Sequence, residues 1–203
     1  MPSHSSDRLA TTSVPIHPPI AARWSPRGFD PEATLAHGDL LALLEAARWS
    51  ATWGRRQPVR FVVGIRDDQT FTALAGLLNR GNSYAKAASA LILVCTDEGE
   101  DDRTARYAGV DAGAAMANLA IEATSRGLHT HPMAGFDVTG AHQSFDIPGQ
   151  VQPLAIVAVG RLGDHEVASE IADRDSLPRE RLPLSEIAFT ERWGAPLPTD
   201  LER

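Results

Sequence analysis

One stretch, residues 105–136, constrains the fold of this chain more than any other. Between Val110 and Ala123 apolar or small residues occupy nearly every helical face, so we expect a helix buried on most sides rather than an amphipathic one. Gly127 follows Arg126, where a helix commonly ends with a residue of positive φ. The helix is therefore predicted to be the central element of a single domain.

The sequence HPMAGF, at residues 131–136, follows this helix closely and has an unusual composition. Proline, alanine and glycine leave the main chain with little side-chain cover. We expect a bare turn against which another molecule can lie.

Strands and helices alternate in the rest of the chain. The strands are predicted from apolar, β-branched runs whose lack of alternation implies cover on both faces. The pattern indicates an α+β or α/β domain in which helices outweigh strands. Strands are expected at 59–65, 90–96 and 153–160, helical segments at 40–49, 67–78, 82–84 and 138–145, and a helix-start signal at 30–32.

Charge and hydropathy narrow the classes of partner. A formal net charge of −7 argues against a nucleic-acid binder or a membrane-surface binder, for which a basic face would dominate. No apolar run approaches the roughly 18 residues that a membrane span needs. The N-terminus lacks the apolar region of a secretory signal, so we expect a soluble, cytoplasmic protein. The single cysteine, Cys95, is interpreted as a buried small hydrophobe.

Five polar residues are candidates for an anion site. Arg23, Ser25 and Arg27 offer two forked cations and a hydroxyl within a short run, and Arg179 and Arg181 add two late cations. Guanidinium groups suit phosphate because they form paired, charge-assisted hydrogen bonds. The alternative interpretation is a solvated, charged loop.

Other catalytic chemistries find little support. His129, His131 and His142 lack the helical spacing of the familiar zinc motif, and the acidic run at 97–102 is interpreted as a solvated loop. No nucleophile elbow, dinucleotide fingerprint or P-loop is present. We therefore predict no metal ligand and no catalytic side chain.

The order of the motifs resembles that of the FMN-dependent nitroreductase family. The resemblance covers nearly everything from residue 20 to residue 187. It rests on RWSPRGF at 23–29, EAARWSATWGRRQPVRF at 45–61, Gly81-Asn82, DAGAAMANLAIEATSRGL at 111–128, HPMAGF at 131–136, AIVAVGR at 155–161 and RERLPLSE at 179–186.

The resemblance implies an α+β fold with a central, mostly antiparallel sheet flanked by helices. It also implies an intertwined homodimer with an extended C-terminal arm and FMN in a groove between the subunits. On this basis we divide the chain into a flexible leader (1–18), an FMN-binding domain (19–188) and an extension that packs on the partner subunit (189–203).

The resemblance also implies which residues bind the cofactor. Arg23, Ser25 and Arg27 would grip its phosphate and ribityl end, with Trp24 in the same segment and Arg179 or Arg181 assisting. Gln57 and Asn82 would contact the flavin from the same subunit. Those expected from the partner subunit are Thr52, Trp53 and Arg55, and those expected along the ring edge are Pro132, Met133, Ala134 and Gly135.

The activity implied is that of an FMN-dependent NAD(P)H oxidoreductase. Hydride would pass by a ping-pong route through FMN to an electron-poor acceptor such as a nitroaromatic or a quinone. Two alternatives stay open: a flavin enzyme specialised for enone or specialised-metabolite reduction, and a non-catalytic flavin-binding dimer. Arg55 stands where the family has asparagine, and it would either strengthen FMN binding or favour an acidic substrate.

Overall fold

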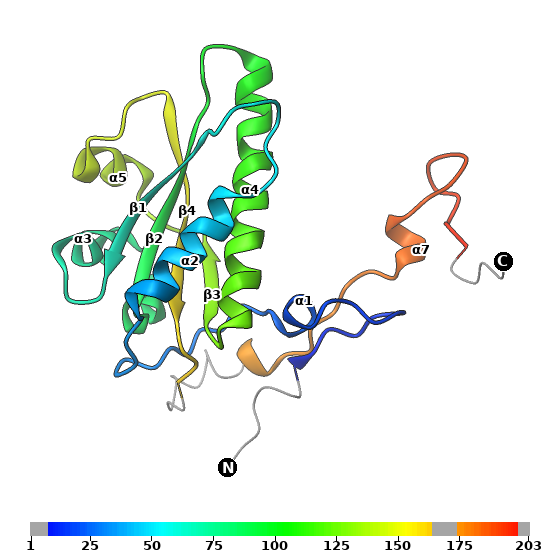
Figure 1. Ribbon diagram of the computed structural model, residues 1–203, viewed down its shortest axis with the longest axis horizontal. Coiled ribbons are helices and arrows are strands. Elements are labelled where there is room, and N and C mark those ends of the chain that lie inside the picture. Colours follow the sequence, from blue (N-terminus) through cyan, green and yellow to red (C-terminus); the bar gives the residue numbers. More distant parts are fainter. Residues whose placement is uncertain (1–7, 164–173, 199–203) are drawn as a thin grey trace.

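A four-stranded antiparallel sheet forms the middle layer of the molecule (Figure 1). The computed structural model describes residues 8–163 and 174–198. Within them the strands follow the spatial order β1-β2-β4-β3, which leaves β1 and β3 at the two edges. Their bounds are Val59–Ile65 for β1, Ala90–Asp97 for β2, His129–Met133 for β3 and Val151–Gly160 for β4.

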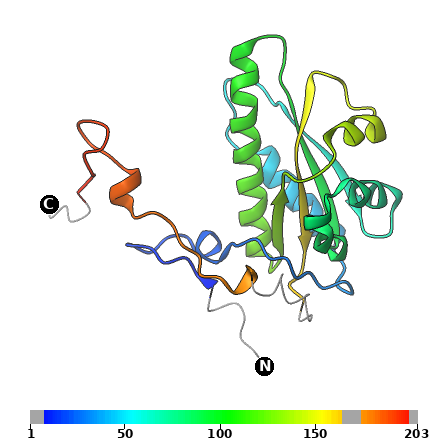
Figure 2. The same ribbon diagram turned by 180° about the vertical axis from the view of Figure 1, so that it is seen from behind.

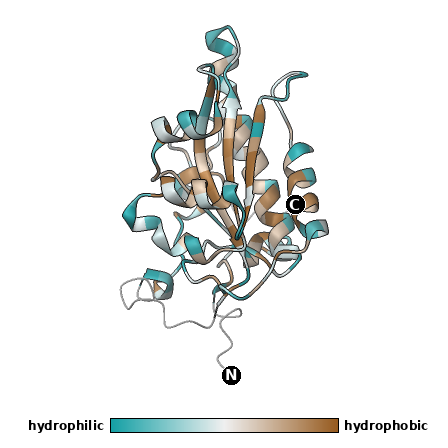
Figure 3. Ribbon diagram, turned by 90° about the vertical axis from the view of Figure 1, so that its left-hand side faces the viewer, coloured by the Kyte–Doolittle hydropathy of each residue, from teal (hydrophilic) through white to brown (hydrophobic). Residues whose placement is uncertain are grey.

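The two central strands are buried on both faces. Leu93 on β2 pairs with Ile156 on β4, and alternate β2 side chains enter opposite cores. Leu91 belongs to one core, whereas Ile92 belongs to the other. Each such fully buried aliphatic side chain stabilises the fold by roughly 1.5–3 kcal/mol. Figure 3 shows these strands as the most hydrophobic layer of the molecule.

Different pairs of helices cover the two faces of the sheet. Helices α2 (His37–Arg48) and α4 (Asp102–Ser125) pack on one face, where Leu43 and Leu119 are fully buried. Helices α3 (Gln69–Leu77) and α5 (Val138–Phe145) lie on the other. Three further short helices are α1 (Pro18–Ala22), η2 (Arg80–Ala87) and α7 (Leu184–Ile187).

Aspartate caps fix where three of the helices begin. Asp101 accepts hydrogen bonds from the Thr104 amide (2.9 Å) and hydroxyl (2.7 Å) at the start of α4. Asp68 and Asp137 cap α3 and α5 in the same way, each satisfying an amide that the helix leaves unpaired. At the other end of α4, Gly127 has a φ of +68°, which confirms the predicted glycine stop.

The prediction that the central helix is buried on most sides is wrong for a single chain. Helix α4 buries one stripe, which includes Ala108, Ala112 and Leu119, at the spacing of successive helical turns. Val110, on another face, is 64% exposed. Small residues cover that face too, so apolarity alone could not distinguish it from the face that packs on the sheet. The exposed residues are Gly109, Val110, Gly113 and Ala117.

The segment expected as a bare turn begins as a strand. Residues His129–Met133 form β3, in which Thr130 pairs with Val159 and Met133 pairs with Ile156. Neither histidine nor proline favours strands, but an edge strand tolerates Pro132 because its outer side needs no amide donor. The turn therefore starts only at Ala134.

The helix-start signal at residues 30–32 is also wrong. Asp30 accepts a hydrogen bond from the Glu32 amide (2.9 Å) in a local turn. Helix α2 begins later, at His37, and its N-cap Ala36 provides no side-chain cap. The same Asx geometry serves turns and caps, so the sequence could not separate them.

Beyond residue 174 the chain forms an extended arm that leaves the body of the molecule (Figures 1 and 2). This is the C-terminal arm that the resemblance implies. Its apolar side chains lie largely in solvent, with Trp193 90% exposed. The others are Leu177, Leu182, Leu184, Ile187 and Leu197.

Candidate functional site

A cluster of arginines lies where the N-terminal segment meets the start of the arm. Burial lowers the pKa of Arg23, and the positive charge of Arg181 lowers it further. Burial and then the charges of Arg23, Arg8 and Arg181 likewise lower the pKa of Arg179. Among residues 8–163 and 174–198, neither Arg23, Arg179 nor Arg181 forms an ion pair with a carboxylate. Positive charge is thus concentrated here in a chain of net charge −7.

The two late arginines of this cluster have different surroundings. Arg179 donates hydrogen bonds to the carbonyls of Arg8, Ala21 (3.1 Å) and Arg23 (2.8 Å), so it braces the backbone. Arg181 is exposed and donates to the carbonyl of its neighbour Glu180 (2.7 Å). Arg181 is therefore better placed than Arg179 to bind an incoming anion.

Arg27 is held by a carboxylate from the start of the arm. Its amide donates to one oxygen of Asp175 (2.6 Å), and its guanidinium donates to the other (2.8 Å). The guanidinium carbon also lies 6.0 Å from the centre of the Tyr84 ring. Arg27 is consequently fixed in direction, with part of its donor capacity already used.

Asn82 of η2 contacts Gly135 in the turn that follows β3. The Asn82 side-chain amide donates to the Gly135 carbonyl (2.8 Å), which also accepts from the Asn79 amide (3.1 Å). A Cβ on residue 135 would lie only 2.8 Å from the Asn82 nitrogen, so this approach requires glycine. In the adjoining segment Met133 is buried, whereas Pro132 and Ala134 are exposed and leave the outer surface nearly bare.

A second group of predicted residues lies on the loop before β1. The Trp53 ring stacks on Tyr107 of α4 with centroids 5.1 Å apart and planes at 10°. Its amide donates to the buried Asp111 carboxylate (2.9 Å), and the guanidinium carbon of Arg103 lies 4.8 Å from the ring centre. These contacts fix the loop across the N-terminal half of α4.

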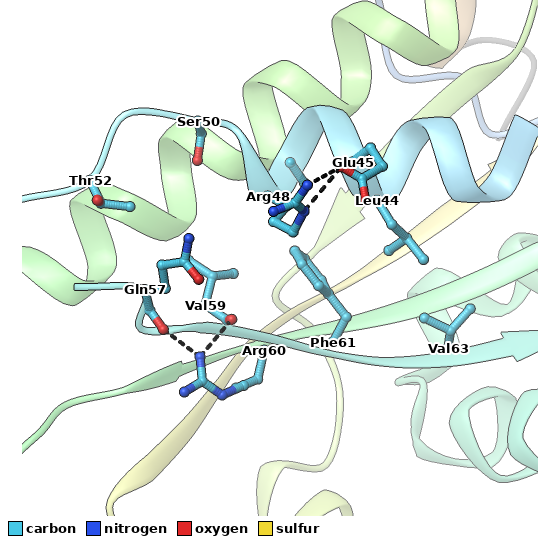
Figure 4. Close-up of a pocket in the computed structure, with 11 residues that line it drawn as sticks. Leu44, Glu45, Arg48, Ser50, Thr52, Gln57, Val59, Arg60, Phe61 and Val63 are labelled. Atoms are coloured by element: carbon cyan, nitrogen blue, oxygen red, sulfur yellow. Dashed lines mark hydrogen bonds and ion pairs between the residues drawn. The ribbon is translucent and has the colours of Figure 1, made fainter. Parts of the chain in front are cut away.

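Thr52 and Gln57 line a pocket of about 410 Å³ between α2 and β1 (Figure 4). Phe61 and Leu44 form part of its apolar wall. The polar lining of the pocket includes an ion pair between Arg48 and Glu45 (2.6 Å). It also includes Arg60, whose guanidinium donates hydrogen bonds to the Gln57 and Val59 carbonyls. Arg55, on the same loop, is exposed.

The predicted residues thus gather in two separate groups within one chain. Gln57 and Asn82, both expected to contact the flavin from the same subunit, belong to different groups, since Gln57 lies with Thr52. The physical reason is that Gln57 precedes β1 whereas Asn82 contacts the turn after β3, and β1 and β3 are opposite edges of the sheet. With strands about 4.8 Å apart, these edges are separated by roughly 14 Å.

Sequence reasoning missed three residues of the first group, namely Tyr84, His131 and Asp175. The His-Thr-His run was considered only as a metal ligand. Two histidines two residues apart on a strand share a face, so the spacing could have indicated that both contact the same neighbouring segment. Among the described residues, no group of three histidine, cysteine or acidic side chains is placed to hold a metal. Burial raises the pKa of the Cys95 thiol to about 11, as expected for a structural cysteine.

The sequence model of the nitroreductase family matches residues 20–98 and 76–161. The chain belongs to the nitroreductase family. Together these matches span more than half of the 203 residues, so the resemblance seen in the motifs is confirmed. A 15.4 kDa protein of Mycolicibacterium smegmatis described as uncharacterized is 64% identical over 148 residues, covering 68% of this chain and 100% of that protein.

Solved structures of the family confirm the fold class. The crystal structure of an oxidoreductase containing FMN is 32% identical, with a TM-score of 0.83 and coverage of 91% of this chain and 96% of that chain. A nitroreductase family protein from Clostridium difficile 630 is 24% identical, with a TM-score of 0.66 over 84% and 94%. A protein from Exiguobacterium sibiricum 255-15 in complex with FMN is 19% identical, with a TM-score of 0.72 over 88% and 98%. In the described part of this chain, no helix has the length and hydropathy to cross a membrane.

Proposed function

We propose that this family member is an FMN-dependent oxidoreductase that works as a homodimer. The observation that carries the proposal is the arginine cluster in which Arg23 and Arg181 have no carboxylate partner among the described residues. Neighbouring guanidinium groups repel each other, and an anion bound between them relieves this repulsion and accepts charge-assisted hydrogen bonds from both. The FMN-containing oxidoreductase that is 32% identical supports a flavin phosphate as that anion.

The residues present fit the cofactor at both of its ends. Arg23, Ser25 and Arg181 would hold the phosphate and ribityl end, while Arg179 braces the backbone beneath them. The nearly bare surface of Pro132 and Ala134 would face the flat ring, because a planar group needs close approach to the main chain.

Three features support a homodimer. The exposed small-residue face of α4 allows another helix to approach closely. The arm carries exposed apolar side chains that gain cover only against another body (Figure 2). The loop bearing Thr52, Trp53 and Arg55 packs on the N-terminal half of α4, whereas α1, which directly precedes Arg23, lies near the opposite end of that helix (Figure 1). A second copy of the chain would therefore bring this loop to the cofactor. Residues 189–198 of the proposed extension belong to this arm, and residues 199–203 lie outside the described ranges.

Bound FMN would supply the two-electron carrier between NAD(P)H and an electron-poor acceptor such as a nitroaromatic or a quinone. The chain itself binds and orients. The ion pair with Asp175 fixes the Arg27 guanidinium within the first group, and Arg55 is an exposed cation on the second. No side chain is required as a proton donor, because the site works by position and electrostatics.

The test of this proposal is an FMN titration of the purified protein and of Arg181→Ala, with Arg192→Ala as a control on the same arm. Losing one charge-assisted hydrogen bond weakens binding by roughly 1.5–3 kcal/mol, so we expect Arg181→Ala to raise the FMN Kd about tenfold or more. Arg192→Ala should leave the Kd unchanged. Equal affinities in all three proteins would contradict the assignment of the phosphate site.

Anaerobic reduction then tests the activity. We expect NADH or NADPH to bleach the bound flavin, and a nitroaromatic or a quinone to restore its colour. A bound flavin that both nicotinamides leave oxidised would contradict the proposed catalysis.

A further inference from the structure

Two histidines of β3 face the N-terminal loop that carries the first arginines. His129 and His131 are two residues apart on an edge strand, so their side chains share a face. Trp24 and Pro26 are likewise two residues apart on the loop. The Trp24 ring meets the His129 ring edge-on at 5.9 Å and 76°, and the Pro26 carbonyl lies 2.8 Å from Nδ1 of His131.

The contacts of His131 define its tautomer. The Pro26 carbonyl can only accept, so Nδ1 of His131 carries the proton and donates it. In a neutral imidazole Nε2 then keeps a lone pair, which accepts from the Tyr84 hydroxyl 3.0 Å away. Both ring nitrogens of His131 therefore form hydrogen bonds, Nδ1 as a donor and Nε2 as an acceptor.

The local electrostatics agree with neutral forms of both groups. Burial, the largest cause, lowers the pKa of His131, and the positive charges of Arg27 and Arg174 lower it further, against the opposing effects of the Pro26 carbonyl and Asp175. Burial raises the pKa of Tyr84 to about 12. The tyrosine thus keeps its proton and the histidine keeps its lone pair at neutral pH.

Each of the three segments that meet at this imidazole carries predicted cofactor-binding residues. Pro26 lies between Ser25 and Arg27, Tyr84 belongs to η2 together with Asn82, and His131 directly precedes residues 132–135. These segments are separated by 47 and 105 positions in the sequence, so continuity of the chain does not align them.

We propose that His131 is a positioning residue for FMN, whose imidazole sets the phosphate-binding loop, η2 and the ring-facing turn in one relative arrangement through its bonds to Pro26 and Tyr84. The inference rests on the proposed function. His131 touches neither reacting partner in this account. It acts through the three segments that are proposed to contact FMN. A binding site assembled from separate loops loses affinity when ligand binding must also order those loops.

Three substitutions separate the two bonds. Tyr84→Phe removes the hydroxyl and keeps the ring. His131→Asn places an amide near the Nδ1 position and can keep the bond to Pro26, whereas His131→Gln reaches the Nε2 position and can keep the bond to Tyr84. His129→Gln is the matched control, since this half-buried histidine is on the same strand face and packs on Trp24 rather than bridging segments.

The readouts are the melting temperature of each protein without cofactor, its FMN Kd and the band shape of the bound flavin in the visible spectrum. We expect each of the three variants to raise the FMN Kd about tenfold, the change given by one unpaired hydrogen-bonding group, and to alter the band shape. The control should bind FMN within about twofold of the wild type.

Double variants give the decisive signature. Because His131→Asn has already lost the Tyr84 bond, adding Tyr84→Phe should not weaken FMN binding further, whereas adding Tyr84→Phe to His131→Gln should weaken it again. Additive losses in both backgrounds, or single variants with a lower melting temperature but an unchanged Kd, would overturn the positioning role. Wild-type protein that fails to bind FMN would instead contradict the proposed function itself.

Discussion

Replacing Gly135 by alanine tests the close contact between η2 and the turn that follows β3, residues 134–135. An alanine Cβ would lie 2.8 Å from the Asn82 side-chain nitrogen, whereas an ordinary contact begins at 3.4 Å. The amide must therefore move by about 0.6 Å, and movement away from the turn stretches its 2.8 Å bond to the Gly135 carbonyl beyond the usual limit of about 3.2 Å. Since the displaced atom ends a flexible side chain, we expect the fold to survive.

The expected size of the effect follows from one lost neutral hydrogen bond, about 1 kcal/mol. For a chain of this length that lowers the melting temperature by roughly 2–4 °C. The FMN Kd should rise about fivefold or more, because both the turn and Asn82 are proposed to contact the cofactor. Differential scanning calorimetry and FMN titration measure the two quantities.

Gly149→Ala is the matched control, because nothing lies within 4 Å of its added Cβ and its φ is not positive. We expect this variant to bind FMN like the wild type. A Gly135→Ala protein whose melting temperature and Kd equal those of the control would refute the reasoning about the turn.

The remaining predictions concern stability, pH and assembly. Gly64→Ala places a Cβ 2.5 Å from the backbone Cα of Phe71, which cannot shift without moving the helix. Urea denaturation should therefore show a free energy of unfolding lower by about 3 kcal/mol or more, and a decrease of under about 1 kcal/mol would contradict this packing. Burial lowers the pKa of His129 and His131, so the unfolded chain takes up protons at a higher pH than the folded chain. The free energy of unfolding should therefore fall as the pH drops below the ordinary histidine pKa of about 6.5, and His129→Gln, which lacks one of the two groups, should lose less. A wild-type melting temperature that stays level between about pH 7.5 and about pH 5.5 would contradict this prediction. Deleting the arm from residue 184 onward should convert a dimer to a monomer in light scattering, and an unchanged mass would exclude the arm from the interface.

Much of the fold follows from local patterns. The runs that form β1, β2 and β4 are β-branched and apolar, and α5 occupies the predicted residues 138–145. Strand β3 could not be found in this way, because Pro132 disfavours a strand, the run lacks the β-branched pattern of the other strands, and only pairing with β4 stabilises it. The exposed face of α4 was missed for the opposite reason, since its small residues look like core.

The candidate site shows the same limit. The arginines and residues 132–135 were predicted from the order of motifs, whose spacing along the chain is visible. Tyr84, His131 and Asp175 were missed because their bonds join residues 47, 105 and 148 positions apart. Such bonds depend on how the segments meet in three dimensions, which no local pattern encodes. The separation of Gln57 from Asn82 likewise became visible only with the order of the strands.

In the proposed function, two copies of this chain enclose FMN, with arginines at its phosphate. Size-exclusion chromatography with light scattering and simultaneous visible absorbance tests it most directly, on protein incubated with excess FMN and then freed of unbound cofactor. We expect one peak with the mass of two chains and one flavin for each chain. A colourless peak with the mass of one chain would contradict it.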